Sequence, residues 1–252
     1  MKRVNSVLNG RLLLSFVLLI GATTQLKAQS FFAGVRTELH VPGSFEFTES
    51  SYPITSSTIT GASFLVKRRF WLDHGFVIDL VGGIGLAPVQ TFEITFQTDD
   101  LGFNYDYDES TTRSTEYGFY KLDFGVNLQY QFRDSPLSIG LAAGVTHLPR
   151  GSVEVSITYA DENGQNEKEV FYEEILPAND YTLYAYVAPN IGYDVAFWDA
   201  EWTVNAGFSF SLQTQFRGRY WIANLENSAP SSGIYRFRGT YAYVGVDYHF
   251  GF

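Results

Sequence analysis

The sequence predicts an all-β protein: one antiparallel up-and-down β-barrel that crosses a membrane, with eight strands as the best count. Three observations lead to this fold class. Apolar residues alternate with polar ones over long segments, the connections between segments alternate between short and long, and aromatic residues gather at one end of the apolar faces. In a membrane barrel the apolar positions face lipid, the polar ones face the lumen, and short turns lie opposite long loops.

The clearest strand is 117–132, with the sequence YGFYKLDFGVNLQYQF. Its even-numbered residues from Tyr120 to Phe132 are apolar, and the odd-numbered residues between them are charged, polar or glycine. A soluble lipocalin-like barrel would alternate in the same way with its apolar face inside, and it stays open as the structural alternative. Aromatic residues at the strand ends favour the membrane barrel. These are Tyr130, Phe132, Tyr193, Phe197, Trp202, Tyr248, Phe250 and Phe252.

The same two-residue period locates the other strands. In chain order the eight segments are 31–41, 57–67, 75–87, 117–132, 137–147, 182–197, 201–214 and 235–252. The first presents Val35, Thr37 and Leu39 outward, and the third presents Ile78, Leu80 and Ile84. The second segment fits neither parity, so we expect a β-bulge near Gly61–Ser63.

Short connections at 68–74, 133–136 and 198–200 carry Asp, Ser and Pro, the residues of tight turns. The other four connections are long: 42–56, 88–116, 148–181 and 215–234. Two of them contain alternating stretches, TFEITFQT and SVEVSITYA, which predict hairpins that extend beyond the membrane or, alternatively, a barrel of ten strands.

Residues 1–28 have the pattern of a cleaved secretory signal peptide. Lys2, Arg3 and Arg11 precede an apolar run at 12–20 that is too short for a membrane-spanning helix, and small residues follow up to Ala28. The remaining residues, 29–252, are expected to form one barrel domain. The chain has no cysteine, so disulfides, thiolate metal sites and cysteine nucleophiles are excluded.

Acidic residues dominate the chain and concentrate in its long loops. Without residues 1–28 there are 13 Lys and Arg against 27 Asp and Glu, which disfavours nucleic acid as a partner. Loop 88–116 holds seven acids and loop 148–181 holds eight. Such loops could shield the surface, bind an extracellular ligand, or hold divalent cations through carboxylates, although neither matches a defined calcium loop. The candidate ligands for a metal are Asp106, Asp108, Asp161 and Glu162. No cofactor is expected.

The last strand carries the most specific motif, with Tyr248, Phe250 and Phe252 at alternate positions up to the terminal residue. In this respect the chain resembles the small outer-membrane β-barrels of Gram-negative bacteria, the OmpA/OmpX-type and PorT-like barrel domains. The family often has glycine where this chain has Asp247. The resemblance implies a monomeric barrel exported to the cell outer membrane, in contact with lipid and lipopolysaccharide. It also implies that the barrel-assembly machinery reads the last strand. The family's functions are diverse, so none is carried over.

Inward-facing ionisable residues are the first candidate site. They are Arg36, Glu38, Asp79, Lys121, Asp123, Asp194, Asp247 and His249. Pairing of the first and last strands is expected to bring Arg36 near Asp247 or His249. The excess of acids suggests protonated carboxylates or a bound cation. The set would form either a paired polar core that fills the barrel or a gate along a narrow ion path.

Two further sets lie at the loop side. Arg217, Arg219, Arg236 and Arg238 flank the fourth loop, near the expected level of lipopolysaccharide phosphates. His40 and His147 lie near the same rim, but no G-x-S-x-G motif accompanies them, so we expect no enzyme. The sequence therefore favours a non-enzymatic barrel that acts by surface binding. A small channel for ions or apolar molecules is the alternative, and a lipid-modifying enzyme is the second alternative.

Overall fold

The computed structural model describes residues 29–49, 54–56, 58–97, 110–148, 151–160, 167–178, 182–223 and 230–250. They form fourteen strands and one short 3-10 helix, η1 (Asp73–Gly75). The strands are β1 (Gln29–His40), β2 (Ser44–Glu49), β3 (Ile54–Ser56), β4 (Ile59–Trp71), β5 (Phe76–Gln97), β6 (Ser110–Gln131), β7 (Leu137–His147), β8 (Val153–Ala160), β9 (Glu167–Pro177), β10 (Leu183–Phe197), β11 (Ala200–Ser211), β12 (Phe216–Ile222), β13 (Ser231–Phe237) and β14 (Tyr241–Phe250). The expected signal peptide, residues 1–28, lies outside the described residues.

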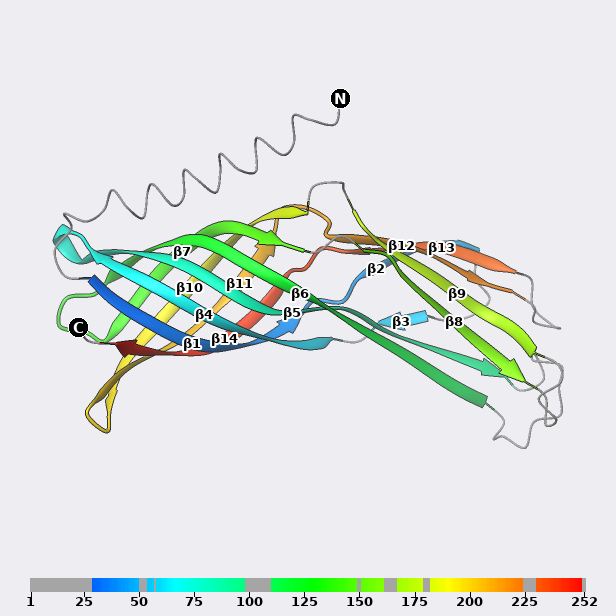
Figure 1. The fold of residues 1–252 in the computed structure, drawn as a ribbon, viewed down its shortest axis with the longest axis horizontal. Coiled ribbons are helices and arrows are strands. Elements are labelled where there is room, and N and C mark those ends of the chain that lie inside the picture. Colours follow the sequence, from blue (N-terminus) through cyan, green and yellow to red (C-terminus); the bar gives the residue numbers. More distant parts are fainter. Residues whose placement is uncertain are drawn as a thin grey trace, which may run out of the picture.

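Eight strands close into an antiparallel barrel, as the sequence predicts. Each pairs with its neighbour in the order β5-β4-β1-β14-β11-β10-β7-β6, and β6 pairs with β5 to complete the ring. The first and last strands pair over ten residues, from Phe31 opposite Phe250 to His40 opposite Tyr241. Closure leaves these eight strands without a free edge along the barrel. Figure 1 shows the barrel on the left, with a β-structured extension continuing from it on the right.

The barrel exterior is apolar. We call these outward, exposed side chains the apolar belt: Val35, Leu39, Phe64, Val66, Ile84, Leu86, Leu122, Phe124, Leu128, Ile139, Leu141, Ile191, Val204, Phe210, Val244 and Val246. Alternate residues of the same strands are buried and mostly polar, such as Asp79, Lys121 and Asn127. Because polar residues face inward and apolar ones outward, this barrel is built for lipid and not for water.

Strand β4 differs from its prediction in two ways. It continues to Trp71 through the segment expected as a turn, and it pairs in unbroken register with β1 and β5 where the bulge near Gly61–Ser63 was expected. The parity looked confused because Leu65 points inward between the outward Phe64 and Val66. A register shift occurs instead in β5, between Pro88 and Gln90, where proline cannot donate a ladder hydrogen bond.

Three short turns join strands at one end of the barrel, which we call the turn end. The tightest connects β10 to β11 through Trp198 and Asp199, whose φ angles of 50° and 56° give the left-handed pair typical of a two-residue hairpin. The opposite end, from which the long connections leave, is the loop end.

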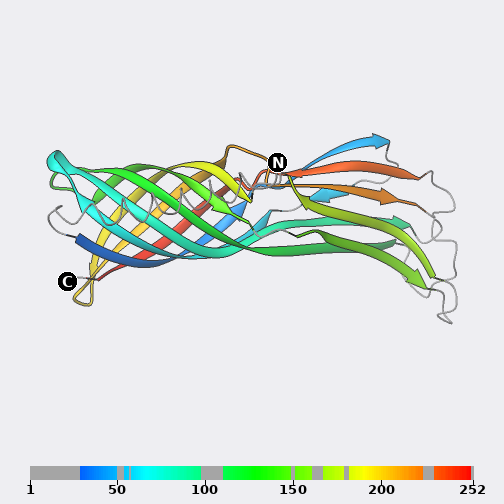
Figure 2. The same ribbon diagram turned by 45° about the horizontal axis from the view of Figure 1, so that its top comes forward.

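At the loop end the chain forms a second sheet of five strands in the order β2-β13-β12-β9-β8, which we call the outer sheet. Strands β5 and β6 run on past the barrel as a paired hairpin, and β3 adds to β5. The hairpins predicted from TFEITFQT and SVEVSITYA are thus confirmed, while the β12–β13 hairpin was missed. Figure 2 shows the extension opening into two groups of strands.

The predicted last strand, 235–252, is in fact two strands. β13 ends at Phe237 and β14 begins at Tyr241, and Gly239 between them has a φ of +74°. That left-handed conformation breaks the extended backbone and favours glycine. The break lets β13 join the outer sheet while β14 closes the barrel.

Candidate functional site

The lumen is filled by layers of paired polar side chains. Six of the eight predicted inward residues are nearly or fully buried: Glu38, Asp79, Lys121, Asp123, Asp247 and, with a side chain 11% exposed, Arg36. Asp194 and His249 are partly buried near the turn end. A barrel of this strand number has an interior just wide enough for side chains to fill.

The layer nearest the turn end centres on Asp79, which lies on β5. Arg69 Nε and Nη2 donate to its two oxygens at 2.8 and 3.0 Å, and Nη2 also donates to Gln129 Oε1 at 3.0 Å. The Phe32 ring lies 4.4 Å from the Arg69 guanidinium carbon, and the His249 ring lies against Phe32. A two-point, fully desolvated pair of this kind fixes the geometry of both groups.

Asp194 and His249 meet at the hydroxyl of Thr203. Thr203 Oγ1 lies 2.6 Å from Asp194 Oδ1 and 2.7 Å from His249 Nε2. Gln131 donates a further hydrogen bond to Asp194 at 2.8 Å. His249 Nδ1 faces the exposed Glu201 at 3.3 Å. These hydrogen-bonded side chains occupy the turn end of the lumen.

The next layer pairs Lys67 with Asp247. Lys67 Nζ lies 2.5 Å from Asp247 Oδ2, which also accepts from Asn205 Nδ2 at 2.9 Å. Sequence reasoning missed both Lys67 and Arg69, because 68–74 was expected to be a turn and 57–67 had no assigned parity. Extending the alternation of β4 by four residues would have placed both inside.

These two cations reduce the inferred excess of acid in the lumen. The sequence weighed Glu38, Asp79, Asp194 and Asp247 against one arginine and one histidine, but Lys67 and Arg69 pair directly with Asp247 and Asp79. Asp194 is held instead by hydrogen bonds from Gln131 and Thr203. The argument for a bound cation or protonated carboxylates is weaker by these two pairs.

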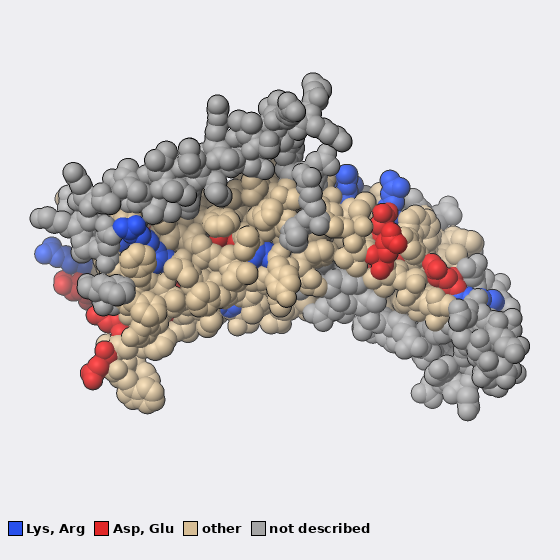
Figure 3. Space-filling view, in the orientation of Figure 1, with Lys and Arg blue, Asp and Glu red and all other residues tan. Residues whose placement is uncertain are grey.

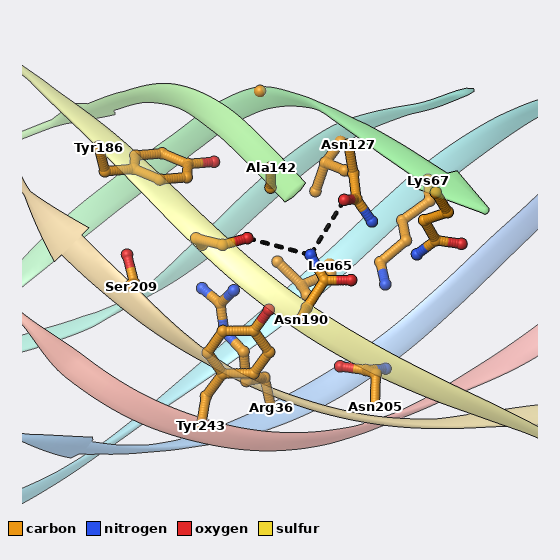
Figure 4. A pocket seen from close by; sticks show the side chains of 14 residues that line it. Arg36, Leu65, Lys67, Asn127, Ala142, Tyr186, Asn190, Asn205, Ser209 and Tyr243 are labelled. Atoms are coloured by element: carbon orange, nitrogen blue, oxygen red, sulfur yellow. Dashed lines mark hydrogen bonds between the residues drawn. The ribbon is translucent and has the colours of Figure 1, made fainter. Parts of the chain in front are cut away.

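A small polar cavity lies between the charged layers (Figure 4). Its volume is about 40 Å³, enough for about two or three water molecules. Asn190 Nδ2 crosses it, donating to Asn127 Oδ1 at 3.0 Å and to the Ala188 carbonyl at 3.1 Å. Arg36 and Lys67 also line the cavity. Its size and polar lining suit buried water rather than a substrate.

The layer nearest the loop end centres on Glu38, which is fully buried. Arg36 Nε donates to it at 3.0 Å, and Lys121 Nζ donates to its two oxygens at 2.9 and 2.7 Å. Ser63 Oγ donates at 2.5 Å, and His40 Nε2 lies 3.0 Å away. Four side chains therefore satisfy one carboxylate, which is the condition for a stable buried charge.

Arg36 extends this layer toward Asp123, not toward Asp247 or His249 as expected. Its Nη2 lies 3.2 Å from Asp123 Oδ2 and 2.9 Å from the Tyr241 hydroxyl, and its guanidinium lies over the Tyr243 ring. The register places Arg36 opposite Gly245, as expected for closure, but the long side chain runs toward the loop end.

Above this layer the lumen is closed by apolar side chains that we call the aromatic plug. It consists of Leu148, Ile175, Tyr184, Phe216, Tyr235 and Phe237, with Phe119 packed against them. The six core members are at most 1% exposed. Phe119 stacks on Phe216 with ring centroids 4.8 Å apart, and Phe237 lies beside the His40 ring. The outer sheet and the barrel thus share one core, which caps the polar lumen.

Aromatic side chains surround the turn end on the outer face. The Tyr130 ring contacts both Phe76 and Phe132. The Tyr248 ring likewise contacts both Trp202 and Phe250. Tyr248 and Phe250 are two of the three predicted assembly residues and lie at the end of β14. The third, Phe252, lies outside the described residues.

The ladder of the barrel wall is interrupted between β10 and β11. The register pairs Val187 with Phe210 and Asn190 with Gly207, and the two positions between them are unpaired. Pro189 occupies this gap and has no N–H to donate. A shallow apolar depression lies on the wall here, lined by Pro189, Ile191 and Phe208 among others, and Asn190 contributes both to it and to the internal cavity.

In the view of Figure 3, charged residues of both signs lie on the extension and at the turn end of the barrel, and the wall between them is largely uncharged. Arg217, Arg219, Arg236 and Arg238 are exposed on β12, on β13 and just beyond it. The metal candidates Asp106, Asp108, Asp161 and Glu162 lie outside the described residues. Among the residues that are described, no group of three or more His, Asp or Glu is placed to hold a metal. No helix within the described ranges is long and apolar enough to span a membrane.

The chain was compared with known proteins. No protein-family model matches it, and no curated protein matches it significantly. Its structure is similar to that of the outer membrane protein OprG from Pseudomonas aeruginosa, at 10% identity over 90% of this chain and 98% of that chain, with a TM-score of 0.45. AlkL, an outer membrane protein solved in lipid bilayers, has 11% identity over 91% and 94% and a TM-score of 0.42.

Ail, the attachment invasion locus protein of Yersinia pestis, has 9% identity over 88% of this chain and 97% of that chain, with a TM-score of 0.31. None of these similarities assigns a function to this chain. The ring of eight paired strands and the apolar belt carry the structural conclusion: the described chain is a β-barrel of the outer-membrane type.

Proposed function

We propose that this protein is a non-enzymatic, monomeric outer-membrane barrel that holds a rigid β-structured platform outside the cell and acts by surface binding. The loop end would face the medium and the turn end the periplasm. We also propose that the chain is related to the OmpA/OmpX-type and PorT-like barrels, and that the barrel-assembly machinery recognises β14.

The observation that supports the proposal best is the aromatic plug. The plug packs the outer sheet directly against the barrel, so the platform is held by a shared apolar core and not only by the connecting loops. Below it, matched ion pairs and their hydrogen bonds occupy the described lumen. An open ion path would have to pass the plug and then separate these pairs, each at a cost of several kcal/mol.

The distinguishing experiment is conductance in planar bilayers. Purified protein, checked for its folded form by heat-modifiable gel migration, should give no steady ion current, while a wide-lumen porin in the same bilayers conducts. A stable, reproducible conductance of the folded protein would contradict the proposal and favour the channel alternative.

A second function, a lateral conduit for apolar molecules, is favoured by the interrupted ladder at Pro189. There an apolar surface depression and an internal cavity share Asn190. If this gap is a path from lumen to lipid, Pro189→Val should restore the ladder and slow the entry of 1-N-phenylnaphthylamine into cells that carry the protein. Val195→Ile, on the same strand but outside the depression, is the matched control. Equal entry with wild type and Pro189→Val would exclude the conduit.

The proposal that the protein is not an enzyme is supported by the surroundings of His40. Its Nε2 faces Glu38, its ring lies between Tyr241 and Phe237, and the residue is 2% exposed. A histidine enclosed in this way has no access to a lipid substrate. Unchanged lipid composition in cells that express the His40→Gln variant would agree with this proposal.

A further inference from the structure

The outer sheet has one face buried in the core and one face exposed, and the exposed face carries two aromatic side chains. On β12, Tyr220 and Ile222 are buried, while Trp221 between them is 39% exposed. On β9, Phe171 is buried and the neighbouring Tyr172 is half-buried. Because the buried face already supplies the core, Tyr172 and Trp221 contribute little to it. Aromatic groups held at the surface of a rigid sheet indicate a contact surface.

Tyr172 and Trp221 form a pair on this face. They lie directly opposite each other in the antiparallel register of β9 and β12. Their ring centroids are 5.2 Å apart, with an angle of 43° between the ring planes. The register continues the row by one residue on each side, with Ser156 opposite Tyr172 on β8 and Ser232 opposite Trp221 on β13. The row therefore consists of two neighbouring aromatic rings with a hydroxyl-bearing residue at either end.

The adjacent row on the same face, one step nearer the barrel, carries charges of both signs. Glu154 on β8 lies opposite Glu174 on β9, and Glu174 lies opposite Arg219 on β12. Carboxylate acceptors and guanidinium donors thus stand next to one another. An anionic ligand in this row would meet the carboxylates, and a cationic one would meet the guanidinium group. The row therefore favours a neutral ligand that both donates and accepts hydrogen bonds.

The two rows together form a small surface that we call the aromatic site: Ser156, Tyr172, Trp221, Ser232, Glu154, Glu174, Arg219 and Ile234. Four strands about 4.8 Å apart and two rows about 6.8 Å apart give an area of about 19 by 14 Å, or about 270 Å². A stable protein–protein interface buries about 800 Å² on each partner. The aromatic site therefore suits a short stretch of a chain molecule better than the surface of a folded protein.

A sugar chain matches both rows. The C–H bonds of a sugar ring pack against the negatively polarised face of an aromatic ring. Its hydroxyl groups both donate and accept hydrogen bonds, so one sugar can use a guanidinium donor and a carboxylate acceptor at once. We propose that the aromatic site binds a neutral sugar chain outside the cell, with successive sugar rings lying on Tyr172 and Trp221. This inference rests on the proposed function, surface binding, and names the class of the partner.

The test uses the full-length folded protein in detergent and immobilised neutral hexasaccharides of glucose, mannose, galactose, xylose and N-acetylglucosamine. We expect surface plasmon resonance to show binding of wild type to at least one of them. Trp221→Ala should weaken that binding at least about tenfold, because a central aromatic contact is lost. Trp221→Phe keeps a ring and should retain most of the affinity. Trp198→Ala is the matched control, at an 88% exposed tryptophan of the turn end, and should bind as wild type does.

The same protein preparation is first measured for conductance in planar bilayers. A steady current would contradict the proposed function whatever the protein binds, whereas a missing sugar complex would contradict only the present inference. The two failures are therefore distinguishable. Heat-modifiable migration confirms that the barrel of each variant is folded.

Three results would overturn the inference: no binding of any neutral hexasaccharide, equal binding by wild type and Trp221→Ala, or an equal loss with Trp198→Ala. Arg217 lies opposite Arg236 one row nearer the barrel, so sulfated hexasaccharides are included as competitors. Tighter binding of a sulfated chain that disappears at high salt would show an anion site and refute a neutral sugar. Capture of a cell-surface protein that depends on Trp221 would likewise refute a sugar chain as the occupant.

Discussion

Replacing Glu38 by glutamine is the most severe test of whether the Glu38 layer of the lumen is free of water and fully paired. The carboxylate is fully buried and receives Arg36, Lys121 and Ser63 as donors, with His40 beside it. Glutamine has nearly the same shape but no charge, and its NH₂ group would face donors. Removing one partner of a buried ion pair typically costs about 3–5 kcal/mol, and we expect a loss of this size in the free energy of unfolding.

Urea unfolding in lipid vesicles, followed by the folded band on gels, would measure the loss. Glu154→Gln, at an exposed acid on β8, is the control and should change the free energy by no more than about 0.5 kcal/mol. In Glu38→Gln, Asp123 alone faces two cations, Arg36 and Lys121. Adding Lys121→Met removes one of them and should restore at least about 1 kcal/mol. A loss below about 1 kcal/mol for Glu38→Gln would refute the reasoning, because it would mean that water already solvates this layer.

Three other predictions concern backbone positions and the last strand. Gly34→Ala should lower the free energy of unfolding of the barrel by about 1–3 kcal/mol, because an added Cβ would lie 2.6 Å from the Val246 carbonyl oxygen. Gly82→Ala is the control: no atom lies within 4 Å of an added Cβ there, so urea unfolding should show a neutral or stabilising effect. Gly239→Ala should cost at least about 1 kcal/mol in the same assay, because its φ is +74°. Phe250→Ala should slow folding more in vesicles that contain the barrel-assembly machinery than in vesicles of lipid alone, and equal slowing would argue against recognition of β14.

The sequence was sufficient for the barrel because lipid imposes a simple rule on each strand. Alternation in 117–132 gave the correct inward and outward faces. In 75–87 it placed Asp79 inward and Ile84 outward, but Leu80, expected outward, is buried. The alternation continued beyond the membrane into the hairpin of β5 and β6. The rule failed for β4, where Leu65 faces inward. Lys67 and Arg69 follow it in a charged segment that was expected to be a turn. Continuing the alternation of β4 through residues 68–71 would have placed Lys67 and Arg69 inside the barrel.

Partner choice within the lumen could not be predicted from parity alone. Arg36 faces inward as expected, yet strand tilt and the reach of its side chain decide that it meets Glu38 and Asp123. The aromatic plug could not be predicted either, because its members come from β9, β12 and β13 of the outer sheet as well as from the loop ends of barrel strands. Each contributes one or two residues whose burial follows only from the way the outer sheet packs over the barrel.

The most direct test of the filled lumen uses the absence of cysteine from the chain. Ser209 is 3% exposed and lines the internal cavity, so Ser209→Cys introduces a single thiol at the centre of the barrel. A charged, membrane-impermeant maleimide should leave it unlabelled from either side, while Ser152→Cys, at an exposed site at the loop end, should react completely. Rapid labelling of Ser209→Cys in the folded protein would show an open aqueous path and contradict the account.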